Sequence, residues 1–138
     1  NKDYEFKIGK SVTLVDGNDI IIFCAGAITK NCLTAAEILQ KKNISVKVVN
    51  MHTIKPIDKN ILDELKNFKL IVSVEEHNIY GGLGSAIAEY NSTFTNSPKQ
   101  LFLGIKDIYG SGGTYDYLKE KHRLDPEKIV EDILKNLD

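Results

Sequence analysis

Four short segments typical of strands, each followed by a segment with helical spacing, constrain the fold of this chain more than any other feature. The predicted strands are 20–25, 46–50, 70–74 and 100–104. The predicted helices that follow them are 30–42, 58–67, 82–90 and 115–121, and a last helix begins at Pro126. Strands that alternate with helices build βαβ units, with parallel pairing and right-handed crossovers. The sequence therefore predicts an α/β domain with helices on both faces of an open sheet.

A fifth strand is expected before the first apolar run. Residues 10–15 alternate weakly between apolar and polar, and Asp16–Asp19 has the composition of a tight turn. This pattern favours a hairpin in which strand 10–15 lies antiparallel to strand 20–25. The complete prediction is a three-layer α/β/α sheet of about five strands, mostly parallel, with one antiparallel edge strand.

Short polar residues suited to helix capping stand where the predicted helices begin. A side-chain oxygen at this position accepts a hydrogen bond from a backbone N–H of the first helical turn. Pro126 follows such a residue at the first helical position, where its missing N–H costs nothing. The expected capping residues are Thr29, Asp58, Thr114 and Asp125.

Length and composition are those of a single globular domain over residues 1–138. A chain of 138 residues can bury roughly two-thirds of the surface that it exposes when unfolded. The net charge of −1 argues against a nucleic-acid or membrane surface, which would need a basic excess. We expect Cys24 and Cys32 to be buried free thiols of a cytoplasmic protein. The chain does not begin with Met, so we expect it to be a piece of a longer protein.

Ligands of open α/β sheets bind outside the carboxyl ends of the strands, and one loop at that edge is the sharpest candidate site. The loop begins with Glu75, Glu76 and His77 and continues into the glycine-rich stretch Gly81, Gly82, Leu83, Gly84 and Ser85. Free N–H groups at the start of the next helix would favour an anion. A carboxylate beside an imidazole could also transfer protons. The alternative, which we favour, is a tightly packed turn whose charged groups meet a neighbouring domain.

Other polar residues give weaker signals. His52 follows a strand end, and an interface or helix-capping role is favoured over catalysis. Three dispersed histidines do not form a zinc site, and no serine or cysteine has a convincing base. The sequence therefore predicts no catalytic, metal-binding or cofactor-binding residue within this chain.

In their order along the chain, several segments resemble the carboxy-terminal domain of transketolase-like enzymes. The resemblance is strongest to the carboxy-terminal subunit of split, two-subunit transketolases. The same domain in deoxyxylulose-phosphate synthase and in the β subunits of 2-oxo-acid dehydrogenase E1 enzymes matches more loosely. The matching segments are Phe6–Lys10, Asp19–Ile22, Ala25–Gly26, Ala35–Leu39, Val48–Asp58, Val74–Asn78, Gly81–Ala86, Gly104–Asp107, Ser111–Gly112 and Leu118.

The resemblance implies thiamine diphosphate and Mg²⁺ in the full enzyme, which moves a two-carbon ketol unit between sugar phosphates of the pentose phosphate pathway. The family's Gly-Asp-Gly motif with its following Asn pair is missing here, as is the middle domain with its activating Glu. We therefore expect this domain to bind no cofactor and to be inactive alone. Its implied partners are the remaining domains or subunit, in a homo-oligomer. The implied role of Glu75, Glu76 and His77 is at an interface or site wall. A free-standing anion-binding regulatory module is the alternative from another class.

Overall fold

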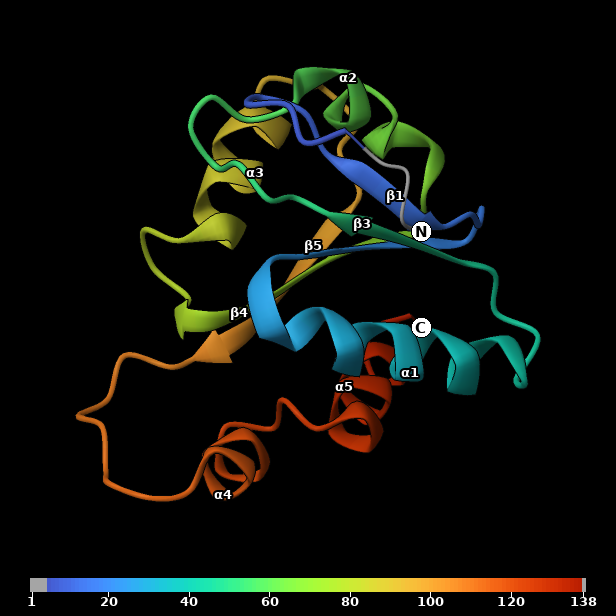
Figure 1. The fold of residues 1–138 in the computed structure, drawn as a ribbon. Coiled ribbons are helices and arrows are strands. Elements are labelled where there is room, and N and C mark those ends of the chain that lie inside the picture. Colours follow the sequence, from blue (N-terminus) through green and yellow to red (C-terminus); the bar gives the residue numbers. More distant parts are fainter. Residues whose placement is uncertain (1–4, 138) are drawn as a thin grey trace.

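A five-stranded sheet lies between two layers of helices in the computed structural model, which describes residues 5–137 (Figure 1). The strands are β1 (Val12–Val15), β2 (Ile20–Cys24), β3 (Val46–Asn50), β4 (Leu70–Asn78) and β5 (Lys99–Ile105). Their spatial order is β1-β3-β2-β4-β5, and every neighbouring pair except β1 and β3 is parallel. The predicted three-layer sheet with one antiparallel edge strand is therefore confirmed.

Helices cover both faces of the sheet, and one more helix lies near the carboxyl ends of β4 and β5 (Figure 1). The helices are α1 (Thr29–Gln40), α2 (Lys59–Leu62), α3 (Leu83–Asn91), α4 (Tyr115–Lys121) and α5 (Pro126–Leu134). The α1 and α5 helices share one core with the sheet, and α2 and α3 share the other. No helix in the described part of the chain is both long and apolar enough to cross a membrane.

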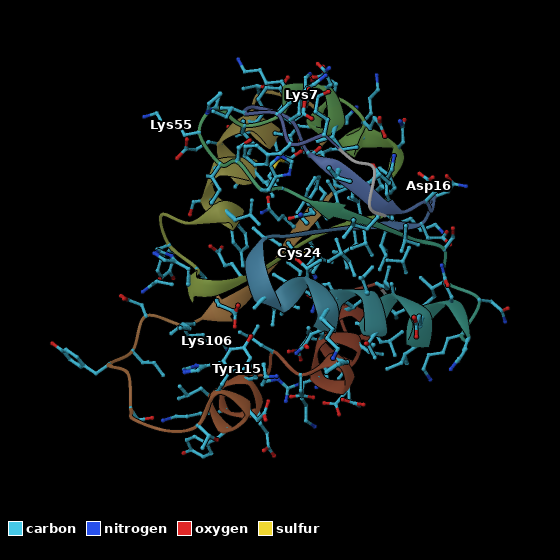
Figure 2. The ribbon with its side chains drawn as sticks, viewed as in Figure 1. Lys7, Asp16, Cys24, Lys55, Lys106 and Tyr115 are labelled. Atoms are coloured by element: carbon cyan, nitrogen blue, oxygen red, sulfur yellow. The ribbon has the colours of Figure 1, made fainter. Side chains whose placement is uncertain are left out.

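The central strand β2 supplies both cores with alternate side chains. Ile20 and Ile22 face the α1/α5 core, whereas Ile21 and Phe23 face the α2/α3 core. This explains the unbroken apolar run, because a parallel strand covered on both faces has no polar side. Cys24 lies in the interior at the end of the strand (Figure 2). Both cysteines are buried and free, as predicted.

The predicted hairpin is wrong, although its first strand does form the antiparallel edge. Strand β1 pairs with β3 rather than with β2, placing Val12 opposite Asn50 and Val15 opposite Val48. An apolar run buried on both faces takes two parallel neighbours, here β3 and β4. Both hydrogen-bonding edges of β2 are then occupied, so β1 cannot pair with it.

The segment between β1 and β2 passes the start of β3 at close range. A Cβ atom on Gly17 would collide with the backbone of Val46, so a residue without a side chain is needed here. Beyond it, the Asp19 carboxylate accepts hydrogen bonds from Lys69 Nζ (2.7 Å) and Ser45 N (2.8 Å). These bonds lower the pKa of Asp19. They tie the start of β2 to the residues that precede both of its neighbours.

Three of the four predicted caps are present. Asp58 accepts a hydrogen bond from Asn60 N, Thr114 from Tyr117 N and Asp125 from Lys128 N. Thr29 is instead the first residue of α1, because a 3₁₀ turn over Gly26–Ile28 precedes it.

Two predicted element boundaries were also wrong. The helix predicted over 58–67 is a short α2 followed by a separate 3₁₀ turn, Leu65–Asn67. Strand β4 runs through Asn78, so Glu75, Glu76 and His77 lie on a strand rather than in a loop.

Candidate functional site

A crevice lies at the carboxyl edge of the sheet, where the order of the strands reverses. From β2 the chain moves to β3 on one side and later reaches β4 on the other. Ligand sites of open α/β sheets occur at such reversals. The crevice has a volume of about 330 Å³ and is bordered by the end of β4 and the start of α3. The predicted site residues that line it are Glu75, Glu76, His77, Gly81 and Gly82.

Glu75 is buried and closes the amino-terminal end of α3. Its Oε2 accepts a hydrogen bond from Leu83 N (2.8 Å), and its Oε1 accepts one from Gly84 N (2.9 Å). A carboxylate at this position is favoured by the partial positive charge of the helix terminus. The backbone N–H groups that could attract an external anion thus hold a carboxylate of the chain itself.

Gly82 leaves room for this carboxylate. A Cβ atom at Gly82 would collide with Oε2 of Glu75, and it would lie 2.8 Å from the carboxyl carbon and 3.0 Å from Nδ1 of His77. Any side chain at this position would therefore push Glu75 away from α3. The requirement for glycine is one of space, since Gly82 has no positive φ.

The rest of the turn is held by its own hydrogen bonds. Gly81, with φ of +79°, donates from its N–H to Ser85 Oγ (2.8 Å), and Ser85 Oγ donates to Ile79 O (3.3 Å). Further into α3, a Cβ atom on Gly84 would lie 2.5 Å from the ring of Phe102 on β5. Close packing accounts for Gly82 and Gly84, and positive φ accounts for Gly81, without an external ligand.

Glu76 and His77 are both exposed near the end of β4, and as neighbours on a strand they point to opposite faces. Hydrogen bonding to the Glu76 carboxylate raises the pKa of Tyr115, on α4, to about 12. Nδ1 of His77 is 2.8 Å from the carbonyl oxygen of Asn78 and 4.0 Å from Oε2 of Glu75. A proton on Nδ1 makes the first contact a hydrogen bond and leaves Nε2 as an acceptor. Both residues remain exposed while their side chains make these contacts.

His52 lies outside this arrangement. Its Nε2 is 3.3 Å from the carbonyl oxygen of Lys7, and its ring centroid is 4.6 Å from that of Phe6. His52 thus contacts the segment that leads into β1 and does not line the crevice. The structure brings Glu75, Glu76 and His77 together with Gly81 and Gly82, and it separates His52 from them.

Residues that the sequence did not single out also shape this edge. Ala25 and Ile54 line the crevice, and Tyr115 reaches Glu76 from α4. The position of Ile54 in the loop that follows β3 at the carboxyl edge was a usable signal. Tyr115 had none, because its contact with Glu76 is made by the tertiary fold.

The crevice does not fit the cofactor that the family resemblance implies. Mg²⁺ and a diphosphate need oxygen ligands and free N–H donors. Among residues 5–137, no group of three or more His, Cys, Asp or Glu side chains could hold a metal ion. The N–H groups of Leu83 and Gly84 are already bonded to Glu75. The geometry supports a rigid polar wall and gives no basis for a reaction step through the cofactor.

Comparison with known proteins identifies relatives over almost the whole chain. Residues 9–129 match the family "Transketolase, C-terminal domain". A protein of Methanocaldococcus jannaschii described as a transketolase C-terminal section is 42% identical over 96% of this chain. The 1-deoxy-D-xylulose-5-phosphate synthase of Halothermothrix orenii is 36% identical over 95% of this chain. A solved split-gene transketolase, described as an inactive β4 tetramer, matches with a TM-score of 0.88 and 33% identity over 99% of this chain.

All three relatives are much longer than the region matched. The chain spans 41% of the M. jannaschii protein, 21% of the synthase and 44% of the solved chain. The shared fold and the family match cover the sheet, the crevice and the glycine-rich turn alike. The chain belongs to the transketolase C-terminal domain family.

Proposed function

We propose that this chain is the structural and dimer-interface domain of a thiamine-diphosphate-dependent transketolase. The complete enzyme moves a two-carbon ketol unit from a ketose phosphate to an aldose phosphate. Within it, this domain supplies an interface and an outer wall beside the active site, and it is inactive alone. The enzyme works in the cytoplasm as a homo-oligomer, without binding nucleic acid or membrane.

The carboxylate of Glu75 carries this proposal. By occupying the N–H groups of Leu83 and Gly84, it gives the crevice a fixed shape before any partner arrives. Glu76 and His77 then remain as the exposed polar groups of the wall. Such an edge suits contact with a protein surface or with the polar end of a substrate held by another domain. It offers little to a phosphate binding here alone.

In the complete enzyme, thiamine diphosphate and Mg²⁺ are bound outside this domain. The cofactor supplies the carbanion chemistry. Glu76 and His77 serve as interface or wall residues first, and they exchange protons with substrate only if assembly brings it within hydrogen-bond distance. No step in this proposal depends on a metal ligand from this chain.

The second candidate is the equivalent domain of a deoxyxylulose-phosphate synthase. The 36% identity to the H. orenii synthase supports this second candidate. The wall described above would serve either reaction. The two candidates differ in the donor substrate, which the other domains bind.

An assay of the complete protein with thiamine diphosphate and Mg²⁺ tests the proposal. We expect turnover with a ketose-phosphate donor and an aldose-phosphate acceptor. Turnover with pyruvate and an aldose phosphate, but without ketose phosphate, would establish the synthase instead. Turnover of a 2-oxo acid with a lipoyl partner would exclude both.

The isolated chain provides the matched control for the proposal that the cofactor is bound outside this domain. Thiamine diphosphate with Mg²⁺ should leave its melting temperature unchanged, because a ligand stabilises a folded protein only by binding to it. A melting temperature that rises with cofactor concentration would contradict a purely structural role.

A further inference from the structure

The segment after β5 carries an exposed apolar surface that the proposed wall does not use. Residues 106–117 are all exposed, in a run that includes the first turn of α4. The exposed fractions are 57% for Ile108, 103% for Tyr109, and 51% each for Tyr115 and Tyr117. Four large apolar or aromatic side chains exposed within ten residues favour an interaction site over an ordinary solvent-facing loop.

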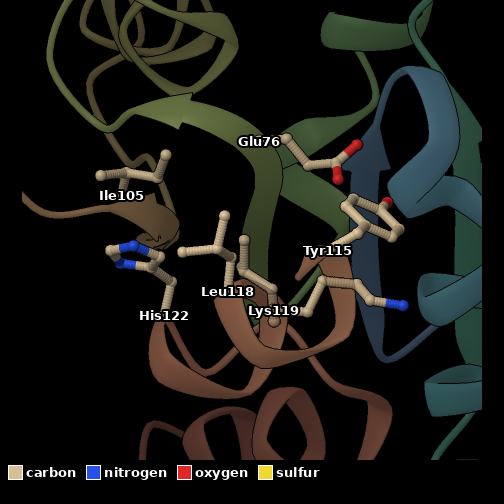
Figure 3. A pocket seen from close by; sticks show the side chains of 7 residues that line it. Glu76, Ile105, Tyr115, Leu118, Lys119 and His122 are labelled. Carbon is tan, nitrogen blue, oxygen red and sulfur yellow. The ribbon is translucent and has the colours of Figure 1, made fainter. Parts of the chain in front are cut away.

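A pocket opens beside this surface, between α4 and the ends of β4 and β5 (Figure 3). Ile105, Leu118 and Leu124 form apolar walls, and Glu76 and His122 add polar groups. Its volume of about 230 Å³ is below the roughly 300–1,000 Å³ of typical small-molecule sites. The pocket therefore suits a single apolar side chain better than a sugar phosphate or a nucleotide.

Several of the charged groups around this surface already have partners within the chain. Lys119 Nζ lies 2.8 Å from Asp116 and 4.4 Å from the ring centroid of Tyr115. Asp107 accepts a hydrogen bond from Asn78 Nδ2 (3.0 Å). A partner that covered this surface would not leave these charges buried without a counter-charge or hydrogen bond. Burying an unpaired charge is the main free-energy cost of covering a charged surface.

The balance of charge narrows the class of partner. Residues 106–122 contain three lysines and three acidic residues, so they offer no basic excess to a nucleic acid or an anionic membrane. The relatives carry more than half of their own length outside the matched region. A protein surface from that remaining length is the occupant that these facts favour.

We propose that residues 106–122 dock onto the remaining part of the same enzyme, with one of its apolar side chains in the pocket of Ile105, Leu118 and Leu124. This inference rests on the proposed function and deepens it by assigning the docking surface. Tyr109 and Ile108 form the apolar centre of the interface, where aromatic anchors usually contribute most. The self-paired charges form its rim.

Hydrogen exchange of the α4 amides tests this docking, in the isolated chain and in the complete protein. We expect exchange across residues 115–121 to slow at least tenfold in the complete protein, while α5 amides change little. Leu118→Trp, which fills the pocket, should remove that protection without lowering the melting temperature of the isolated chain. Leu14→Trp, on the exposed β1 edge, is the control and should leave the protection intact.

Three outcomes would overturn the proposal. Equal α4 exchange in both proteins, or protection that survives Leu118→Trp, would show that nothing enters the pocket. Protection that rises with concentration of the isolated chain would assign the surface to a second copy instead. Transketolase activity measured on the same samples separates the two ideas. If the complete protein is active but its α4 amides are not protected, the docking surface alone is refuted. If the α4 amides are protected but the protein has no transketolase activity, the proposed function alone is refuted.

Discussion

At the scale of single residues, the site is organised by a carboxylate and a glycine that need one another. Glu75 holds the first two N–H groups of α3, and Gly82 leaves the space that its carboxylate fills. The sequence located the glycine-rich turn and the three polar residues before it. It could not show which acidic side chain pointed inward, because neighbouring strand positions differ only in the face that the fold buries.

Replacing Gly82 with Val should destabilise the domain strongly. The new side chain would displace Glu75, leaving two N–H groups without their charged acceptor, at a cost of about 3 kcal/mol. Urea unfolding of the isolated chain measures this cost.

Gly110→Val is the matched control for Gly82→Val. A Cβ atom at Gly110 would meet nothing within 4 Å, so the change should stay within about 0.5 kcal/mol of wild type. An unfolding free energy for Gly82→Val close to that of this control would refute the packing explanation.

At the scale of elements, caps and helical spacing were readable, whereas strand pairing was not. Asp58, Thr114 and Asp125 cap their helices because this requires only a short polar side chain beside the first turn. The position of β1 depended on two distant strands that surround β2, so local turn composition was misleading. Strand β4 was predicted too short because the polar residues Glu75, Glu76 and His77 end its apolar run in the sequence.

Asp58 joins two elements and should make stability depend on pH. Its Oδ2 accepts bonds from the N–H (2.8 Å) and hydroxyl (3.0 Å) of Ser11, and its Oδ1 accepts one from Asn60 N (3.2 Å). Burial alone would raise the pKa of Asp58. The bonds from Ser11 and Asn60, with nearby Lys10, outweigh it and hold the pKa below its ordinary value of 3.8. The carboxylate therefore stabilises the fold above that value, and the stabilisation is lost as pH falls through the lower folded-state pKa.

We expect Asp58→Ala to cost about 2 kcal/mol near neutral pH, through loss of the cap and of the bonds to Ser11. The difference from wild type should shrink as pH falls below 3.8. Denaturant unfolding across pH 2 to 7 would measure it. A difference that is constant across this range would show that the charged carboxylate contributes nothing.

At the scale of the whole molecule, the central strand β2 contributes side chains to both cores. Because β2 sends alternate side chains to opposite faces, neither core can lose its packing without disturbing the strand that supports the other. The apolar run and the alternating helices were enough to predict this architecture. The face assigned to each helix, and the contact of α4 with Glu76, depended on tertiary geometry that no local spacing encodes.

This architecture predicts a single cooperative unfolding transition. Ile22→Ala, in the α1/α5 core, and Ile21→Ala, in the α2/α3 core, should each destabilise the whole domain by about 2–5 kcal/mol. Far-UV circular dichroism and tyrosine fluorescence should report coincident midpoints. Leu14→Ala, on the exposed edge strand, is the control and should change little. Two separated transitions in either core variant would mean that the cores unfold independently.

The carboxylate at the start of α3 also determines how this end of the helix responds to its surroundings. The Glu75 carboxylate is tethered to the chain, so it competes with free anions for these N–H groups at an effective concentration of about millimolar or more. That concentration does not vary with the cell's metabolism. A free phosphate or carboxylate would have to displace Glu75 and leave its charge half-enclosed beside Gly82. The glycine-rich turn therefore behaves as a site already saturated by its own chain, insensitive to metabolite levels that would titrate an open helix terminus.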